Sequence, residues 1–197
     1  MLRCGDFDRQ RAKRELALDT ARDLERFLAS VEKRAFKIAQ IAVRDTEDAL
    51  DIVQDSMLQL ARRYAARPGD EWKPLFYRIL QNRIRDCQRR RLARSKIFAW
   101  LPARQNAQGE DYEDPVDLAP SRDPGPGERI MIAGAIDALQ SALQALPPRQ
   151  QQAFLLRNFE GLDVADTAAA MGCSEGSVKT HYFRALQALR EALGEHW

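Results

Sequence analysis

The sequence has little cysteine and little histidine: three cysteines and two histidines in 197 residues. The cysteines, Cys4, Cys87 and Cys173, lie far apart and include no Cys-x-x-Cys pair, which argues against a disulfide framework and against a zinc site. Two histidines leave few groups for a metal hydrolase or a histidine-based triad. Glycine-rich nucleotide motifs and the Gly-x-Ser-x-Gly motif are also absent. We therefore predict that the protein is not an enzyme and uses no metal and no cofactor.

Long apolar runs are missing too. No run approaches the roughly 20 apolar residues that a membrane-spanning helix needs. Residues 1–6 lack the apolar centre of a secretory signal. We therefore expect a cytoplasmic protein with no direct membrane insertion.

Segments that alternate apolar and polar residues are not found, whereas three stretches have apolar residues at helical spacing. The apolar positions are Ala49, Ile52, Val53, Met57, Leu60 and Tyr64; then Trp72, Leu75, Phe76, Ile79, Leu80, Ile84 and Cys87; then Ile136, Leu139, Leu143 and Leu146. Hydrophobic residues make up 45% of the chain, and its length allows a sizeable core. The predicted fold class is all-α.

Residues 101–128 interrupt the helical pattern. They contain five prolines, three glycines and seven acidic residues against two arginines. Such a composition does not offset the entropy lost on ordering, so it predicts a flexible linker or a segment ordered only by a partner. A flexible coil of this length spans about 30 Å, and about 90 Å when fully extended. We expect two small helical domains, 21–100 and 129–197, joined by this acidic linker, and an extension at 1–20 without fixed structure.

Charge is sorted along the chain, although the total is only +2. The net charge is −5 between Asp45 and Ala61, +9 between Lys73 and Arg104, and −6 over residues 105–128. This sorting indicates several partners of opposite sign. The acidic helix around Asp51 is interpreted as a solvated face or a docking surface for a basic partner, because no further ligands complete a metal site.

A helix-turn-helix pattern lies near the carboxyl end. Residues 164–171 read as a short helix, Gly172 ends it, and Ser174 is a good N-cap for a second helix from Glu175. In such motifs the second helix enters the DNA major groove. The alternative is an ordinary helical hairpin with a solvated polar face.

A second candidate for nucleic-acid binding is the basic helix over residues 82–91, which follows Trp72, Phe76 and Tyr77. Cations beside aromatic rings suit single-stranded or unpaired nucleic acid. The alternative is that the aromatic residues belong to the core and the arginines form a solvated face.

The order of these features resembles a known family. Residues 48–55 read Asp-Ala-Leu-Asp-Ile-Val-Gln-Asp, and residues 76–91 contain Phe-Tyr-Arg-Ile, an asparagine, an aspartate and three consecutive arginines. The acidic linker, Ala-Leu-Pro-Pro-Arg and the helix-turn-helix follow in order. Over residues 24–100 and 130–193 the chain resembles bacterial RNA polymerase sigma factors of the sigma-70 family, in the extracytoplasmic-function group that keeps only regions 2 and 4.

The resemblance implies a role for each segment. One helix would dock on the β′ clamp helices of core RNA polymerase, through Asp48, Asp51, Gln54 and Asp55. The loop at 67–71 would hold a base flipped from the minus-ten element, and the basic helix would lie against that element. The minus-ten residues implied are Arg67, Asp70, Asn82, Arg85, Asp86, Arg89, Arg90 and Arg91. The minus-thirty-five element would be read by Ser174, Glu175, Ser177, Lys179, Thr180, His181 and Arg184. The linker would thread the polymerase channels.

Three positions depart from the family pattern. Trp72 stands one turn before the usual tryptophan, and we expect it to fill the same core space. His181 occupies a position where arginine is common, and Thr167 replaces an aliphatic residue. Cys87 and Cys173 suit either redox sensing or small buried hydrophobic positions.

Three hypotheses follow. The first is a transcription initiation factor that binds core RNA polymerase and promoter DNA, helps to open the promoter and is held inactive by an anti-sigma factor. The second is a free-standing, dimeric DNA-binding regulator. The third, an enzyme acting on nucleic acid, lacks the metal cluster or histidine–acid pair that it needs.

Overall fold

The computed structural model of the chain describes residues 4–98 and 126–194, with side chains over 18–94 and 134–194. Within these ranges every element is helical, as predicted. The first group of helices is α1 (Cys4–Val43), α2 (Thr46–Tyr64) and α3 (Gly69–Phe98). The second is α4 (Pro126–Ala145), α5 (Pro148–Phe154), a short π-helical turn η1 (Leu155–Phe159), α6 (Val164–Met171) and α7 (Glu175–Ala192). The expected linker lies outside the described residues except at its end, where α4 begins.

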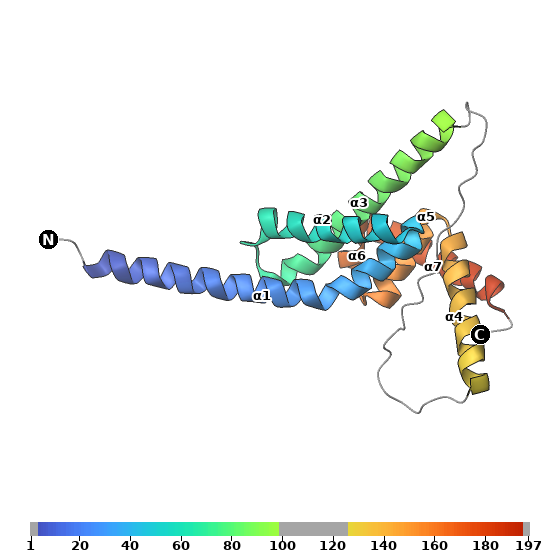
Figure 1. Cartoon of the computed structure of the whole chain (residues 1–197), viewed down its shortest axis with the longest axis horizontal. Coiled ribbons are helices and arrows are strands. Elements are labelled where there is room, and N and C mark those ends of the chain that lie inside the picture. Colours follow the sequence, from blue (N-terminus) through green and yellow to red (C-terminus); the bar gives the residue numbers. More distant parts are fainter. Residues whose placement is uncertain (1–3, 99–125, 195–197) are drawn as a thin grey trace.

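Helix α1 corrects one expectation. Residues 1–20 were expected to lack fixed structure, but α1 is helical from Cys4 and its amino-terminal half projects beyond the other helices (Figure 1). The reason is local: residues 4–20 contain no proline and are rich in good helix formers, and the packed part of α1 supplies the costly nucleus from which the helix extends.

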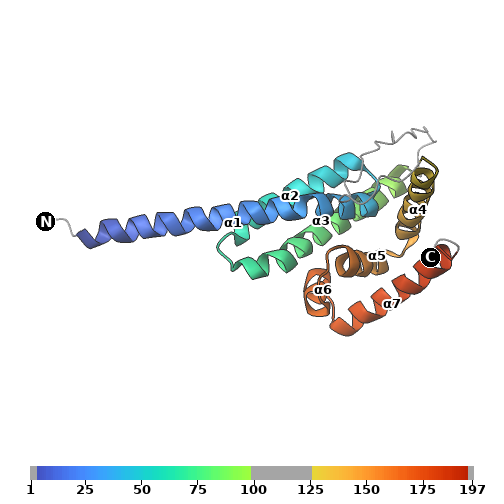
Figure 2. The same cartoon turned by 90° about the horizontal axis from the view of Figure 1, so that it is seen from below.

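Helices α1, α2 and α3 form a three-helix unit (Figure 2). Its turns carry clear local signals. Arg44 adopts a positive φ of 56° between α1 and α2, and Asp45 caps α2 by accepting a hydrogen bond of 3.0 Å from the Asp48 amide. Trp72 is buried, as expected: its ring lies 5.9 Å from that of Phe27, and its Nε1 donates to the Tyr64 carbonyl at 3.1 Å.

Helices α4 to α7 form the second unit. Its core includes Leu143 and Leu146, but Ile136 and Leu139, earlier on the same predicted stripe, are 40% and 38% exposed. Gly172 ends α6 with a φ of 64°, the left-handed conformation that favours glycine.

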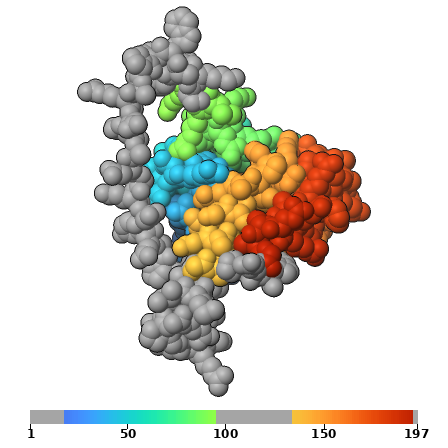
Figure 3. All heavy atoms as spheres, turned by 90° about the vertical axis from the view of Figure 1, so that its right-hand side faces the viewer, coloured from blue at the N-terminus to red at the C-terminus, as the bar shows by residue number. Residues whose placement is uncertain are grey.

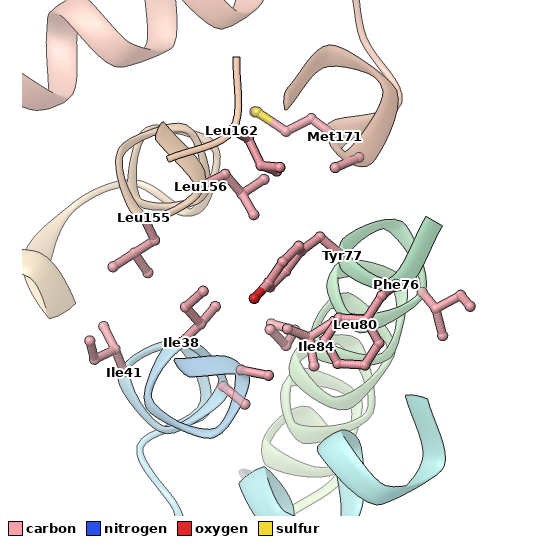
Figure 4. Packing of buried hydrophobic residues seen from close by; sticks show 14 of the residues in the cluster. Ile38, Ile41, Phe76, Tyr77, Leu80, Ile84, Leu155, Leu156, Leu162 and Met171 are labelled. Carbon is pink, nitrogen blue, oxygen red and sulfur yellow. The ribbon is translucent and has the colours of Figure 1, made fainter. Parts of the chain in front are cut away.

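The two units pack against one another (Figure 3), an arrangement that the linker composition did not predict. Helix α3 lies against α6, and α1 lies against α4. Buried residues of both units form one continuous apolar cluster, in which Ile38 and Tyr77 face Leu155, Leu156 and Met171 (Figure 4). The two helical units therefore share one apolar core.

Candidate functional site

The acidic face of α2 comprises Asp48, Asp51, Gln54 and Asp55, and the structure separates its members. Asp48 faces α3, where its Oδ2 accepts hydrogen bonds from Arg91 Nε at 2.9 Å and Cys87 Sγ at 3.3 Å. Asp55 is paired with Arg83 at 3.2 Å. Asp51 and Gln54 are exposed, with no hydrogen-bond or ion-pair partner among the described residues. The part of this face that is free to bind a partner is therefore its middle.

Two leucines that the sequence reasoning missed flank this middle part. Leu50 is 46% exposed and Leu58 is 51% exposed. With Gln54 they repeat every four residues along α2, on the side away from its buried stripe. The sequence could have revealed them, because both leucines fall outside the apolar stripe that predicts the buried side of this helix. Helix α2 thus presents a surface that is both acidic and apolar.

The basic segment of α3 comprises Asn82, Arg85, Asp86, Arg89, Arg90 and Arg91. All except Arg91 are largely exposed, and their hydrogen bonds stay within the helix: Arg89 pairs with Asp86 at 3.0 Å, for example. The excess positive charge on this exposed part of the helix attracts phosphates. The segment can bind nucleic acid without losing contacts that hold the fold.

Arg91 is held by the fold instead. Its guanidinium pairs with Asp45 at 3.0 Å and with Asp48, and it donates to the Val43 carbonyl. The hydrogen bond from Cys87, followed by Arg91, lowers the pKa of Asp48 despite the opposing effect of burial. The implied phosphate contact of Arg91 is therefore not available in this conformation, in which Arg91 ties α3 to the α1–α2 corner.

The aromatic residues beside the basic segment are core residues. Trp72, Phe76 and Tyr77 are 4%, 0% and 0% exposed. No ring among them is available to stack on a base in this conformation. The alternative interpretation, in which these aromatic residues belong to the core, is therefore correct. The exposed arginines beside them are still accessible to nucleic acid.

The loop between α2 and α3 contributes Arg67, and Asp70 follows in the first turn of α3; both side chains are exposed. Arg67 Nη1 lies 3.4 Å from Glu71 Oε2. An apolar groove opens beside the loop, between α1 and the carboxyl end of α2, with Leu28, Met57 and the Trp72 ring in its wall. The loop therefore combines a polar rim with an apolar recess.

The helix-turn-helix begins and ends as predicted. Asp163 caps α6 through the Asp166 amide at 2.7 Å, and Ser174 caps α7 through the Ser177 amide at 3.2 Å. Thr167, the departure from an aliphatic residue, is fully buried and satisfies its hydroxyl on the Asp163 carbonyl at 2.6 Å. Capping residues on both helices thus fix the turn.

Helix α7 is anchored by Val178, Ala185 and Leu189, which are buried. Its outer face carries the predicted polar residues: Glu175, Lys179, Thr180 and Arg184 are exposed, and Ser177 and His181 are half-buried. The sequence reasoning missed Phe183, the large apolar side chain that is most exposed on this face, at 66%. An aromatic ring on such a face can contact the methyl group of thymine.

The two cysteines whose side chains the structure describes differ in burial. Cys87 is buried and Cys173 is half-buried. Burial, followed by the neighbouring Asp48 carboxylate, raises the pKa of the Cys87 thiol. A protonated thiol is a poor nucleophile, so Cys87 fits the small buried hydrophobe better than the redox sensor.

Over the parts of the chain that the structure describes, no three His, Cys, Asp or Glu side chains gather in a way that could hold a metal ion. No helix in those parts is both long and apolar enough to cross a membrane.

Comparisons with known proteins were made in sequence and in structure. Residues 136–189 match the family described as Sigma-70, region 4. The ECF RNA polymerase sigma factor SigM of Mycobacterium tuberculosis is 31% identical over 167 residues, covering 82% of this chain and 72% of SigM. The RNA polymerase sigma-H factor of Pseudomonas aeruginosa is 30% identical over 176 residues, covering 87% of this chain and 88% of that factor.

The alignment with SigE of Mycolicibacterium smegmatis, 30% identical, covers only 58% of that relative's length. Two solved structures share the fold. Sigma factor RpoE in complex with the anti-sigma factor NepR from Bartonella quintana gives a TM-score of 0.64 at 22% identity, over 89% of this chain and 99% of that one. CnrH in complex with the cytosolic domain of CnrY gives 0.57 at 18% identity, over 94% and 99%.

Proposed function

Because this chain belongs to the extracytoplasmic-function group of sigma-70 factors, we propose that it binds core RNA polymerase, directs it to specific promoters and assists promoter opening. It would do so in the cytoplasm and without a catalytic centre of its own. The observation that carries the proposal is the division of labour within the chain. One helix presents an unpaired acid, a second presents exposed arginines, and a capped helix-turn-helix presents a polar outer face.

The polymerase contact is assigned to the middle of the acidic face of α2. Asp51 and Gln54 are exposed and unpaired among the described residues, and Leu50 and Leu58 add apolar area beside them. A basic clamp helix would pair with the acid and cover the leucines. Asp55 would join this contact by leaving its ion pair with Arg83 and pairing with the clamp helix instead. Asp48 would support the contact indirectly, because its hydrogen bond from Arg91 holds α2 against α3.

The minus-ten contact is assigned to the domain over 21–100. Arg67 of the loop and Asp70 of the first turn of α3 would hold the extruded base, and extrusion costs least where the duplex unstacks easily. The exposed residues Asn82, Arg85, Asp86, Arg89 and Arg90 of α3 would lie along the strand, the arginines on phosphates.

The minus-thirty-five contact is assigned to the domain over 129–197. Polar side chains on the outer face of α7 would read base edges and phosphates in the major groove. In this structure Ser174 and Ser177 form the N-cap of α7. The Ser174 hydroxyl accepts a hydrogen bond from the Ser177 amide, and the two hydroxyl oxygens lie 2.9 Å apart. We add Phe183 to this set.

The linker over 101–128 would connect the two contacts through the polymerase channels. An anti-sigma protein is the proposed inhibitor, because the two solved structures named above are described as complexes, one of them with the named anti-sigma factor NepR. It would cover the polymerase and DNA faces together.

Run-off transcription with purified bacterial core RNA polymerase and a library of promoter-like DNAs tests the proposal. The wild-type chain should yield specific transcripts, and Asp51→Arg should abolish them. Glu25→Arg, an equal charge reversal at an exposed position of α1, is the matched control and should retain them. Absence of transcripts and of polymerase binding by the folded wild-type chain would overturn the proposal.

A further inference from the structure

Residues 4–18 of α1, which we call the arm, project from the rest of the described chain. Figures 1 and 2 view the molecule from perpendicular directions, and both show α1 running past the turn between α2 and α3. Leu18, at the base of the arm, is 59% exposed. Helices in proteins owe most of their stability to the packing of an apolar face. An arm of about four turns with an exposed leucine at its base therefore indicates a contact that the single chain does not complete.

An apolar groove begins where the arm ends. It lies between residues 20–32 of α1 and the carboxyl end of α2, and its lining includes Leu28, Ala29, Met57 and Trp72. Its volume of about 1180 Å³ exceeds the roughly 300–1,000 Å³ of most small-molecule pockets. A long apolar groove between two helices suits the apolar face of a third helix.

The arm and the groove match in length, but not within one chain. At 1.5 Å per residue the arm is about 22 Å long, and the part of α1 that lines the groove is about 20 Å long. Both belong to one continuous helix, so the arm points away from its own groove. A second copy turned antiparallel brings its arm alongside that groove. The midpoint of the paired segment, residues 4–32, is Leu18, which places a two-fold axis there.

The helical register supports this pairing. At about 100° per residue, Leu18 lies on the same face of α1 as Ala29 and Glu32, which line the groove. The same face continues into the arm at position 7, about three turns before Leu18, where the sequence has phenylalanine. Antiparallel pairing about residue 18 sets position 7 of one copy opposite Ala29 of the other. A large residue then meets a small one, as in interdigitated cores.

Net charge selects the same register. The arm carries four basic residues, all within 9–14, against three acids, whereas residues 19–32 carry four acids against two arginines. The pairing therefore sets a net charge of +1 opposite a net charge of −2. A contact between the two arms alone would instead bring the basic segments 9–14 together, which like-charge repulsion disfavours.

We propose that the free chain forms a two-fold symmetric dimer, in which the two α1 helices pair antiparallel about Leu18 and the arm of each copy lies in the groove of the other. Such an isologous contact is self-complementary and ends at two copies. Arg67 also lines the groove, so a seated arm covers a residue assigned to the extruded base. That the dimer cannot open a promoter rests on the proposed function, whereas the dimer itself does not.

Analytical ultracentrifugation of the full-length chain over a wide range of concentration tests the dimer. The wild type should pass from one chain to two as concentration rises. Leu18→Asp removes two leucines and places two carboxylates at the axis, so it should weaken association by about tenfold or more. Its helicity and Tm should stay unchanged, because Leu18 is exposed in the single chain. Leu92→Asp, an equal change at a 64% exposed position of α3, should associate like the wild type.

Disulfide formation tests the position of the two-fold axis. The background is Cys4→Ser with Cys173→Ser, and the buried Cys87 is retained. Leu18→Cys should form a disulfide-linked dimer under mild oxidation, because the axis brings residue 18 of one copy next to residue 18 of the other. Leu92→Cys, which is similarly exposed, should form far less of the linked dimer.

Two results would overturn the dimer. One is a wild-type chain that stays monomeric at every concentration, which would leave the groove to a different protein. The other is an association that Leu18→Asp does not weaken, with Leu18→Cys cross-linking no faster than Leu92→Cys. Failure of the proposed function looks different: the chain then dimerises as described, but it neither binds core polymerase nor supports transcription.

Discussion

Three consecutive arginines on α3 are equivalent in sequence but not in structure, and this difference gives a sharp prediction. Arg91→Gln should lower the free energy of unfolding, because Arg91 joins α3 to Asp45, Asp48 and the Val43 carbonyl. Arg90→Gln removes the same charge one residue earlier. The guanidinium of Arg90 makes only an intrahelical bond of 3.4 Å to the Asp86 carbonyl, so its loss should cost little.

The expected magnitude follows from exposure. The Arg91 side chain is 38% exposed, and those of Asp45 and Asp48 are 44% and 42% exposed. Ion pairs open to this degree contribute about 0–1 kcal/mol each, so two of them with one backbone acceptor give about 1–2 kcal/mol. For a chain of this size that is about 2–8 °C in Tm. Arg90→Gln should stay within about 0.5 kcal/mol of wild type.

Thermal unfolding at neutral and acidic pH measures the difference. The contacts of Asp48 lower its pKa, so its contribution is present above the ordinary value of 3.8 and is lost as pH falls through the lowered pKa. The gap between Arg91→Gln and wild type should therefore narrow in strong acid. Equal stability of Arg91→Gln and Arg90→Gln at neutral pH would refute the assignment. So would a loss of promoter affinity in Arg91→Gln at unchanged stability.

Three further predictions concern single side chains. Trp72→Ala should lower the free energy of unfolding by about 3–5 kcal/mol in denaturant titrations, because the ring is 4% exposed; a loss below about 1 kcal/mol would contradict its place in the core. Ser174→Ala should cost about 1 kcal/mol in thermal unfolding and Ser174→Asp should restore it, whereas equal losses would rule out the N-cap role. Phe183→Ala should leave stability within about 0.5 kcal/mol and weaken minus-thirty-five binding. Deoxyuridine in place of a contacted thymidine should weaken wild-type binding about fourfold, the worth of one methyl group, and should leave Phe183→Ala unaffected.

The helix-turn-helix could be predicted from sequence to the residue because its signals are local. Ser174 and Gly172 act on backbone groups within four residues of themselves, so their effect is readable without the rest of the fold. Trp72 belongs to the same class, since the helical stripe already places it on a buried side.

The remaining features depend on contacts between residues far apart in the chain. Arg91 and Asp48 are 43 positions apart, and Lys73 and Glu160 are 87 apart. No periodicity distinguishes Arg91 from Arg90, and nothing near Glu160 in sequence indicates that α3 will cover it. Composition likewise suggested a tether between two units without revealing that the units close on one another.

Affinity for core RNA polymerase tests the central claim most directly. A fluorescently labelled chain is titrated with purified core enzyme, and wild type is compared with Asp51→Arg and the matched control Glu25→Arg. Wild type and Glu25→Arg should bind alike, and Asp51→Arg should lose binding while keeping its Tm, because Asp51 is exposed and has no partner among the described residues. Unchanged binding by Asp51→Arg would contradict the assignment of α2 as the polymerase contact, and a folded wild-type chain that does not bind core enzyme would contradict the account as a whole.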